Sequence, residues 1–118
     1  LIARAGYADI FEGYGGVVVR PAFFDEQAYD IPKDLWAVDD VWLSGMLARR
    51  GIQIWVAADF YEPKNTVADL TEALYRWKTS NMTRAELNAR CARYLRDTYG
   101  VWSDAAPQVA PPMRVAAR

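Results

Sequence analysis

The sequence predicts a small α/β domain in which helices pack on a small mixed sheet. A β-branched run at residues 17–19 is typical of a buried strand. Residues 52–57 alternate two isoleucines and a valine with glutamine and tryptophan, as a strand does. Residues 39–51 have the apolar spacing and the terminal signals of a helix. A helix that ends at glycine and continues straight into a strand is an ordinary connection in α/β folds.

The composition is that of one globular domain with a single modest core. The chain has 118 residues, of which 53% are hydrophobic and 25% are charged. A net charge of -1 argues against a nucleic-acid surface, because such surfaces depend on clustered positive charge. Five tryptophans and seven tyrosines are many for this length. Aromatic side chains at this density build cores, and they also line carbohydrate and other ligand sites.

The chain contains no histidine, which excludes Ser-His-Asp triads, Cys-His pairs and histidine-containing metal sites. Cys91 is the only cysteine, so the chain can form neither an internal disulfide nor a thiolate zinc cluster. Acid–base chemistry would therefore fall to Asp, Glu, Tyr, Lys or Cys91. We interpret Cys91 as a core residue, because it lies in the apolar stripe of a predicted helix and has no histidine to activate it.

The chain is organised around the predicted helix at residues 39–51. Asp39 is expected to cap its N-terminus and Gly51 to close its C-terminus. Its apolar stripe consists of Trp42, Leu43, Met46 and Leu47. Asp39 and Asp40 thus lie at the positive end of the helix dipole, where negative charge is favourable. Two interpretations remain open: a cap followed by an ordinary first-turn acid, or a catalytic carboxylate on a rigid element.

The other elements follow from local signals along the chain. Glycines within residues 13–16 predict a tight turn, which either joins two strands or lets a ligand approach the backbone. Pro21 is expected to open a short helix. Thr83 and Glu86 match a capping box, which begins a helix ending at Gly100. Strands are expected at residues 8–12, 16–20 and 52–57, and helices at residues 66–78 and 83–100.

The domain is expected to occupy residues 1–102, followed by a disordered tail rich in proline and alanine at residues 103–118. The sequence opens among apolar residues and without Met, so we expect it to be a piece of a longer protein. We expect neither a signal peptide nor a membrane span, because the apolar runs are far shorter than the roughly 20 residues a spanning helix needs. A reducing, cytoplasmic setting fits these expectations.

Two motifs together resemble a known enzyme family. Residues 12–21 read Glu-Gly-Tyr-Gly-Gly-Val-Val-Val-Arg-Pro, and after a short gap residues 38–44 read Val-Asp-Asp-Val-Trp-Leu-Ser. In order and spacing they resemble the C-terminal half of the catalytic domain of nucleotide-sugar glycosyltransferases of the GT-A fold. The run from Asn88 to Trp102 is similar to the close of some bacterial, family 2-like members. The resemblance covers roughly residues 8–102 and implies the acceptor-side half of a GT-A-like fold.

The resemblance also implies site residues. The family places an acidic pair at the start of a helix, where it supplies the base that deprotonates the acceptor hydroxyl. Asp40 is therefore the first choice for the catalytic base and Asp39 the second. Substrate binding is assigned to Gly15, Gly16, Glu12, Tyr14, Trp36 and Trp42. Trp42 has a second interpretation as a core residue, because it lies on the apolar stripe.

The family's metal-binding and nucleotide-binding half, with its Asp-x-Asp motif, would precede Leu1. We therefore expect this chain to bind no metal or cofactor by itself and to be inactive alone. A divalent metal, a nucleotide-sugar donor and a carbohydrate or lipid-linked acceptor are expected only for the full-length parent enzyme. The chain itself offers no Asp-x-Asp spacing, and adjacent acids on a helix diverge by about 100°, which disfavours chelation of one ion.

Two other functions remain open. The first is a non-catalytic α/β module that binds a protein partner through the apolar, aromatic-rich surface left exposed by a missing half. The second is a fragment of a glycoside hydrolase, which needs two carboxylates about 5 to 10 Å apart across a cleft. Glu12 and Asp40 are the pair available for such a site.

Overall fold

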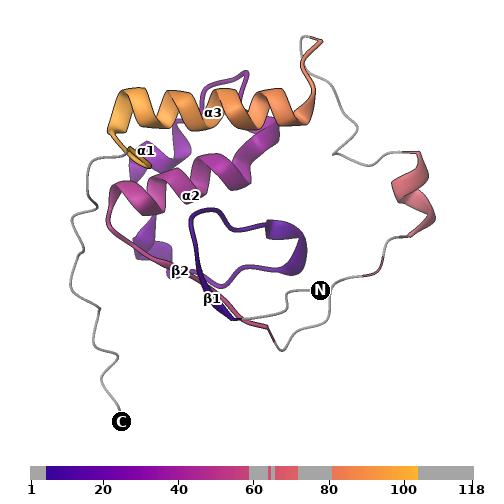
Figure 1. The fold of residues 1–118 in the computed structure, drawn as a ribbon, viewed down its shortest axis with the longest axis horizontal. Coiled ribbons are helices and arrows are strands. Elements are labelled where there is room, and N and C mark those ends of the chain that lie inside the picture. Colours follow the sequence, from indigo (N-terminus) through magenta and orange to yellow (C-terminus); the bar gives the residue numbers. More distant parts are fainter. Residues whose placement is uncertain (1–4, 59–63, 65, 72–80, 104–118) are drawn as a thin grey trace.

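The structure is a computed structural model and describes residues 5–58, 64, 66–71 and 81–103. Within these ranges it contains three α-helices and one two-stranded antiparallel sheet, joined by short 3-10 turns. The elements are β1 (Gly6–Ala8), α1 (Glu26–Tyr29), α2 (Asp39–Arg49), β2 (Ile54–Val56) and α3 (Arg84–Tyr99). Figure 1 shows α2 and α3 stacked along one another above the β1–β2 ribbon. The segment after β1 lies between α2 and this ribbon. The predicted α/β class is confirmed at this coarse level.

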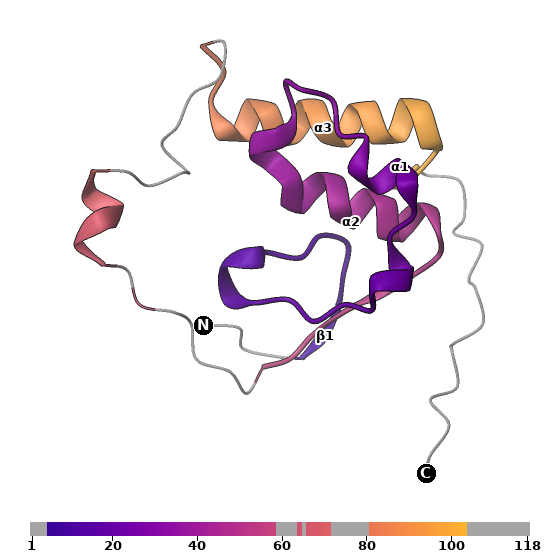
Figure 2. The ribbon, with the colours of Figure 1, turned by 180° about the vertical axis from the view of Figure 1, so that it is seen from behind.

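The core lies between α2 and α3. Helix α2 is buried on most of its circumference, because α3 covers one side while the N-terminal segment and α1 cover others. The Trp42 side chain is 1% exposed, and its indole N–H donates to the carbonyl of Ala28 in α1 at 2.8 Å. Figure 2 shows from behind that α1 lies at one end of the helix pair. The predicted stripe on α2 is confirmed, with Trp42, Met46 and Leu47 buried and Leu43 partly buried.

Of the two predicted ends of α2, the glycine stop at the C-terminus is found and the cap at the N-terminus is not. The prediction of Asp39 as the N-cap is wrong: a 3-10 turn, Trp36–Val38, runs directly into the helix, so Val38 occupies the cap and Asp39 is the first helical residue. The predicted glycine stop is confirmed, since Gly51 has φ +70°. Two backbone bonds complete a Schellman ending, from Ile52 N–H to Leu47 O and from Gly51 N–H to Ala48 O, each 3.0 Å.

Helix α3 begins and ends at the residues that the sequence predicts. The Glu86 N–H donates to Thr83 Oγ1 at 3.3 Å, and the Thr83 N–H donates to Glu86 Oε2 at 2.6 Å, which completes the capping box. Gly100 ends the helix in the left-handed conformation at φ +70°. Cys91 is fully buried in the core between α2 and α3, as its place in the apolar stripe indicates.

The sheet is smaller than predicted. β1 pairs with β2 in antiparallel register, with Tyr7 opposite Trp55. The first strand ends where the prediction of 8–12 begins, β2 lies within the predicted 52–57, and the strand predicted at 16–20 is wrong. A 3-10 turn at Gly13–Gly15 redirects the chain, and the valines that follow are exposed and pair with no strand among the described residues. Strand propensity produces a strand only where a partner is available.

The remaining expectations are met in part or fall outside the described residues. Pro21 opens a 3-10 helix, Pro21–Phe23, and α1 follows it. In the helix predicted at 66–78, the structure describes a 3-10 helix at Val67–Leu70, and residues 72–78 lie outside the described ranges. Of the predicted tail at 103–118, residues 104–118 also lie outside them.

Candidate functional site

The acidic pair at the start of α2 is divided between two environments. The Asp40 carboxylate faces the glycine turn and accepts a hydrogen bond from the Gly13 N–H at 3.0 Å to Oδ2. Asp39 instead accepts a local bond from the backbone N–H of Asp40, at 3.1 Å to Oδ1. Consecutive side chains on a helix point about 100° apart, so one helix start cannot aim both carboxylates at the same target. The geometry therefore distinguishes Asp40, the first-choice base, from Asp39.

Gly13 allows this close approach because it has no side chain. A Cβ atom placed on Gly13 would lie 2.9 Å from Asp40 Oδ1, closer than Cβ atoms come to other heavy atoms. The turn that follows is closed by a bond from the Gly16 N–H to Gly13 O at 3.0 Å, with Gly16 at φ +93°. A glycine at position 13 thus brings the backbone against the carboxylate, and a glycine at position 16 supplies the positive φ that the turn requires.

Gly15 and Gly16, the two glycines assigned to the substrate pocket, do not contact Asp40 in the way Gly13 does. A Cβ placed on either of them would meet no described atom within 4 Å. They border open space beside the carboxylate-bound residue. The site residues assigned from the sequence thus include two glycines of this turn but not Gly13, the residue of the turn that bonds to the Asp40 carboxylate.

Ser44 is a second site residue that sequence reasoning missed. Its side chain is 0% exposed, and its Oγ accepts a hydrogen bond from the Phe11 N–H at 3.1 Å. Ser44 lies one helical turn after Asp40, so both side chains project from the same face of α2. The sequence carried a signal for this role: a small polar residue four positions after an acid, within an otherwise apolar stripe.

The aromatic residues assigned to substrate binding divide into buried and exposed sets. Trp42 is a core residue, so the structure contradicts its assignment as a face for a sugar ring and supports the alternative. Trp36 is 47% exposed in the turn that precedes α2, and Tyr14 is exposed in the 3-10 turn next to Gly13. Glu12 is also exposed. These three side chains lie on the two segments that meet at Asp40.

The opposite end of α2 carries charge of the other sign. Arg49 forms an ion pair with Asp25, and its guanidinium lies 5.7 Å from the ring centre of Tyr99. The hydrogen bond from Arg49 holds the pKa of the Asp25 carboxyl below its ordinary value of 3.8. In the core, burial raises the pKa of the Cys91 thiol to about 11. That thiol stays protonated near neutral pH, which leaves Cys91 unsuited to act as a nucleophile or a base.

The described residues offer no ready-made site for a metal ion. In residues 5–58, 64, 66–71 and 81–103, no three acidic or cysteine side chains come together in a group that could hold one. No helix in the described part of the chain has the length and apolar character needed to cross a membrane.

Comparison of the chain with models of protein families, with curated proteins and with solved structures found no match. A function must therefore be inferred from the arrangement of Asp40, Gly13 and Ser44 and from the motifs in which they lie.

Proposed function

We propose that this chain is the acceptor-side portion of a glycosyltransferase that moves a sugar from a nucleotide-sugar donor to an acceptor hydroxyl. The single observation that carries the proposal is the hydrogen bond between the Asp40 carboxylate and the Gly13 N–H. It joins the two sequence motifs that resemble this class of enzyme, through two residues that lie 27 positions apart in the chain. A helix-capping carboxylate would bond to the first turn of its own helix and would not reach a distant glycine turn.

Asp40 is suited to accept a proton. It lies in the first turn of α2, where the helix dipole favours negative charge. Gly13 occupies its Oδ2 atom, and within the described residues its Oδ1 atom accepts no hydrogen bond. The side chain is half-buried, so an acceptor hydroxyl can reach it. A general base needs both features: an ionised group and an oxygen within hydrogen-bond distance of the proton it takes.

In the proposed reaction Asp40 takes the proton of the acceptor hydroxyl as the hydroxyl oxygen forms a bond to the anomeric carbon of the donor sugar. The bond from that carbon to the nucleotide phosphate breaks, and the phosphate leaves with the electron pair. Exposed Trp36, Tyr14 and Glu12 would contact the sugar rings and hydroxyls beside the base. The donor, and any divalent metal that binds its phosphates, would be held by the parent enzyme outside this chain.

The test is the rate of sugar transfer by the full-length enzyme carrying Asp40→Asn. Asparagine keeps the shape and an oxygen that can accept the Gly13 bond, and it removes the basicity. We expect the transfer rate to fall by about 10² to 10⁴, the usual contribution of a general base. Asp39→Asn is the matched control, because it removes the same charge from the same helix turn, and it should retain most of the activity. An Asp40→Asn enzyme that transfers sugar at the normal rate would exclude Asp40 as the base.

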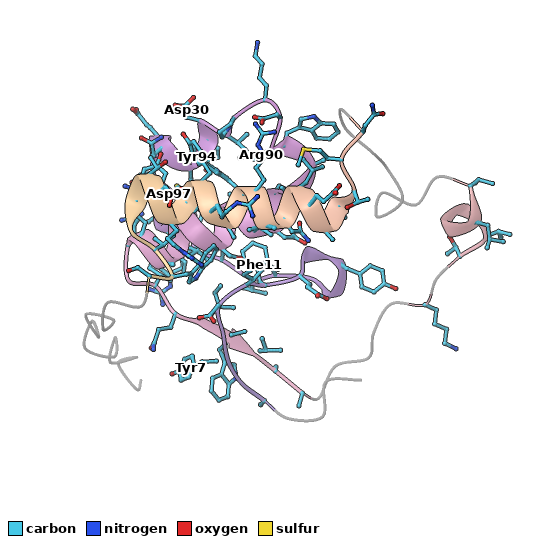
Figure 3. The ribbon with its side chains drawn as sticks, turned by 45° about the horizontal axis from the view of Figure 1, so that its top comes forward. Tyr7, Phe11, Asp30, Arg90, Tyr94 and Asp97 are labelled. Atoms are coloured by element: carbon cyan, nitrogen blue, oxygen red, sulfur yellow. The ribbon has the colours of Figure 1, made fainter. Side chains whose placement is uncertain are left out.

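A second candidate function, a protein-interaction module, is favoured by the outer face of the β1–β2 ribbon. Tyr7 and Trp55 pair edge to face across the two strands, with ring centres 5.0 Å apart, and are 67% and 59% exposed. Figure 3 shows Tyr7 at the far side of the ribbon from the helices. Exposed aromatic pairs are frequent at protein interfaces. Unchanged transfer by the Asp40→Asn enzyme would favour this function over catalysis.

A further inference from the structure

One face of α2 binds the segment at residues 11–13 through two side chains that are one helical turn apart. Ser44 Oγ accepts from the Phe11 N–H at 3.1 Å, and Asp40 Oδ2 accepts from the Gly13 N–H at 3.0 Å. The two donors are alternate residues of the chain, and the two acceptors are positions i and i+4 of a helix. We call these four residues the α2 clamp.

The clamp fits because two residues of extended chain span nearly the same distance as four residues of an α-helix. Glu12, between the two donors, has extended backbone angles of φ -109° and ψ 113°. In an extended chain alternate N–H groups point to the same side, and they repeat every two residues, about 6.6 Å. Four residues of an α-helix rise about 6 Å, so acceptors at positions 40 and 44 meet donors at positions 11 and 13. Helix α2 thereby takes the place of a neighbouring strand, which this segment does not have among the described residues.

The two halves of the clamp are exposed to water to different degrees. The bond between Phe11 and Ser44 is buried, and Figure 3 shows Phe11 between the ribbon and the helix pair. The bond between Gly13 and Asp40 is exposed. A buried hydrogen bond is costly to leave unmade, whereas an exposed one exchanges with water at little cost. The Ser44 half therefore anchors the segment, and the Asp40 half depends on that anchor.

We propose that Ser44 is a positioning residue for Asp40. By holding the Phe11 amide, Ser44 fixes the segment so that the Gly13 amide is presented to the Asp40 carboxylate and orients it. The inference rests on the proposed function only where it gives Asp40 the role of base. Apart from that role, the inference predicts that the Gly13–Asp40 bond depends on the Phe11–Ser44 bond and not the other way round. Loss of the Ser44 hydroxyl should release Gly13, whereas loss of the Asp40 carboxylate should leave Phe11 in place.

The first test is amide hydrogen exchange, measured by NMR on this chain and referred to the Leu95 amide of α3. In Ser44→Ala we expect the Phe11 and Gly13 amides to exchange at least about tenfold faster, because both bonds open locally. In Asp40→Ala only the Gly13 amide should do so, with Phe11 unchanged within about twofold. Cys91→Ala is the control, a buried change in α3 outside the clamp. It should not alter the exchange rate of the Phe11 or Gly13 amide relative to that of the Leu95 amide.

If Ser44→Ala does not fold, Ser44→Cys serves the same test, because the thiol is of similar size and a weaker acceptor. It should accelerate exchange at Phe11 and Gly13 in the same direction by a smaller factor. The proposal is overturned if the Gly13 amide in the Ser44 variant exchanges no faster, relative to Leu95, than it does in Cys91→Ala.

The second test separates positioning from stability in the full-length enzyme. Ser44→Ala should lower kcat by about 10 to 100-fold, as small misplacements of a catalytic group do, with the acceptor KM changed far less. Cys91→Ala should leave kcat unchanged. An unchanged kcat in Ser44→Ala, in an enzyme that Asp40→Asn inactivates, would contradict a positioning role. An Asp40→Asn enzyme with full activity would refute the proposal that Asp40 is the base. The amide exchange rates would then still show whether Ser44 orients the Asp40 carboxylate.

Discussion

The helix pair and the N-terminal segment are held by different forces. Between α2 and α3 the contacts are apolar and close: Gly45 lies so near Leu95 that a Cβ on the glycine would be 2.5 Å from Leu95 Cδ1. The segment from β1 to residue 20 is mostly exposed, and hydrogen bonds hold it. These are the two bonds of the α2 clamp and the ladder of the three-residue strands β1 and β2.

This difference places the candidate site on a boundary. Asp40 belongs to the helix that the core fixes, and Gly13 belongs to the segment that directional bonds fix. Apolar packing tolerates little change in volume, but it does not specify which amide faces which oxygen. Hydrogen bonds specify the donor and the acceptor, and at an exposed position they tolerate changes in the volume around them. A site built across the boundary obtains rigidity from one side and adjustable contact with a ligand from the other.

The largest expected effect is the loss of packing in the helix pair. Trp42→Ala removes a buried side chain and leaves the Ala28 carbonyl without its indole donor. We expect the free energy of unfolding to fall by about 3 to 5 kcal/mol, measured by urea denaturation. Trp55→Ala, on the exposed face of the ribbon, is the matched control and should cost about 1 kcal/mol or less. Equal losses in the two variants would contradict the division between a packed and an exposed region.

The next effect comes from adding volume to the same interface. Gly45→Ala gains about 0.5 to 1 kcal/mol of helix propensity, but its methyl group must displace Leu95, which costs about 1 to 3 kcal/mol. Because the steric cost exceeds the gain in helix propensity, the variant should be less stable than the natural chain in urea denaturation. Gly45→Ala combined with Leu95→Val should be more stable than the sum of the single changes predicts. Strict additivity would show that the two residues are not in contact.

The features that the sequence predicted correctly are those whose cause lies within a few residues. The capping box at Thr83 and Glu86, the stop at Gly100 and the stop at Gly51 each depend on atoms no more than five positions away. The apolar stripe of α2 depends only on helical spacing. Local chemistry decides such features, so they can be read before the fold is known.

The features that were missed depend on distant parts of the chain. The strand expected at 16–20 needed a neighbouring strand, and the described chain provides none there. Ser44 received no role from the sequence, because its donor, Phe11, lies 33 residues away. For the same reason the sequence indicated Gly15 and Gly16, whereas the residue against Asp40 is Gly13. Asp39 failed as a cap because the preceding turn already had helical character.

A second glycine substitution contrasts with Gly45→Ala across the boundary. A Cβ on Gly13 also makes a short contact, 2.9 Å, but its neighbour is the tip of the Asp40 side chain, which can rotate away. Gly13→Ala should therefore cost about 1 kcal/mol or less in urea denaturation, near the net value of one hydrogen bond. It should nevertheless displace the carboxylate and accelerate exchange of the residue 13 amide. Gly15→Ala, whose Cβ meets no described atom within 4 Å, is the control and should change neither quantity.

The smallest expected effect is the pH dependence contributed by the ion pair at the far end of α2. Because the hydrogen bond from Arg49 lowers the folded-state pKa of Asp25 below 3.8, the folded chain binds a proton there less readily than the unfolded chain does. The stabilisation is therefore fully present above pH 3.8 and is lost as the pH falls through the lower folded-state value. Asp25→Asn removes the titrating group and keeps its shape.

The difference in melting temperature between the natural chain and Asp25→Asn, followed from about pH 6 to about pH 2, isolates this contribution from that of the other carboxylates. The natural chain should be the more stable at the upper end of this range, and the difference should shrink below pH 3.8. Both side chains of the pair are partly exposed, so the difference should also shrink in high salt. A difference that stays constant with pH would mean that the titration of Asp25 contributes nothing to stability, and the ion pair with Arg49 would then not stabilise this end of α2.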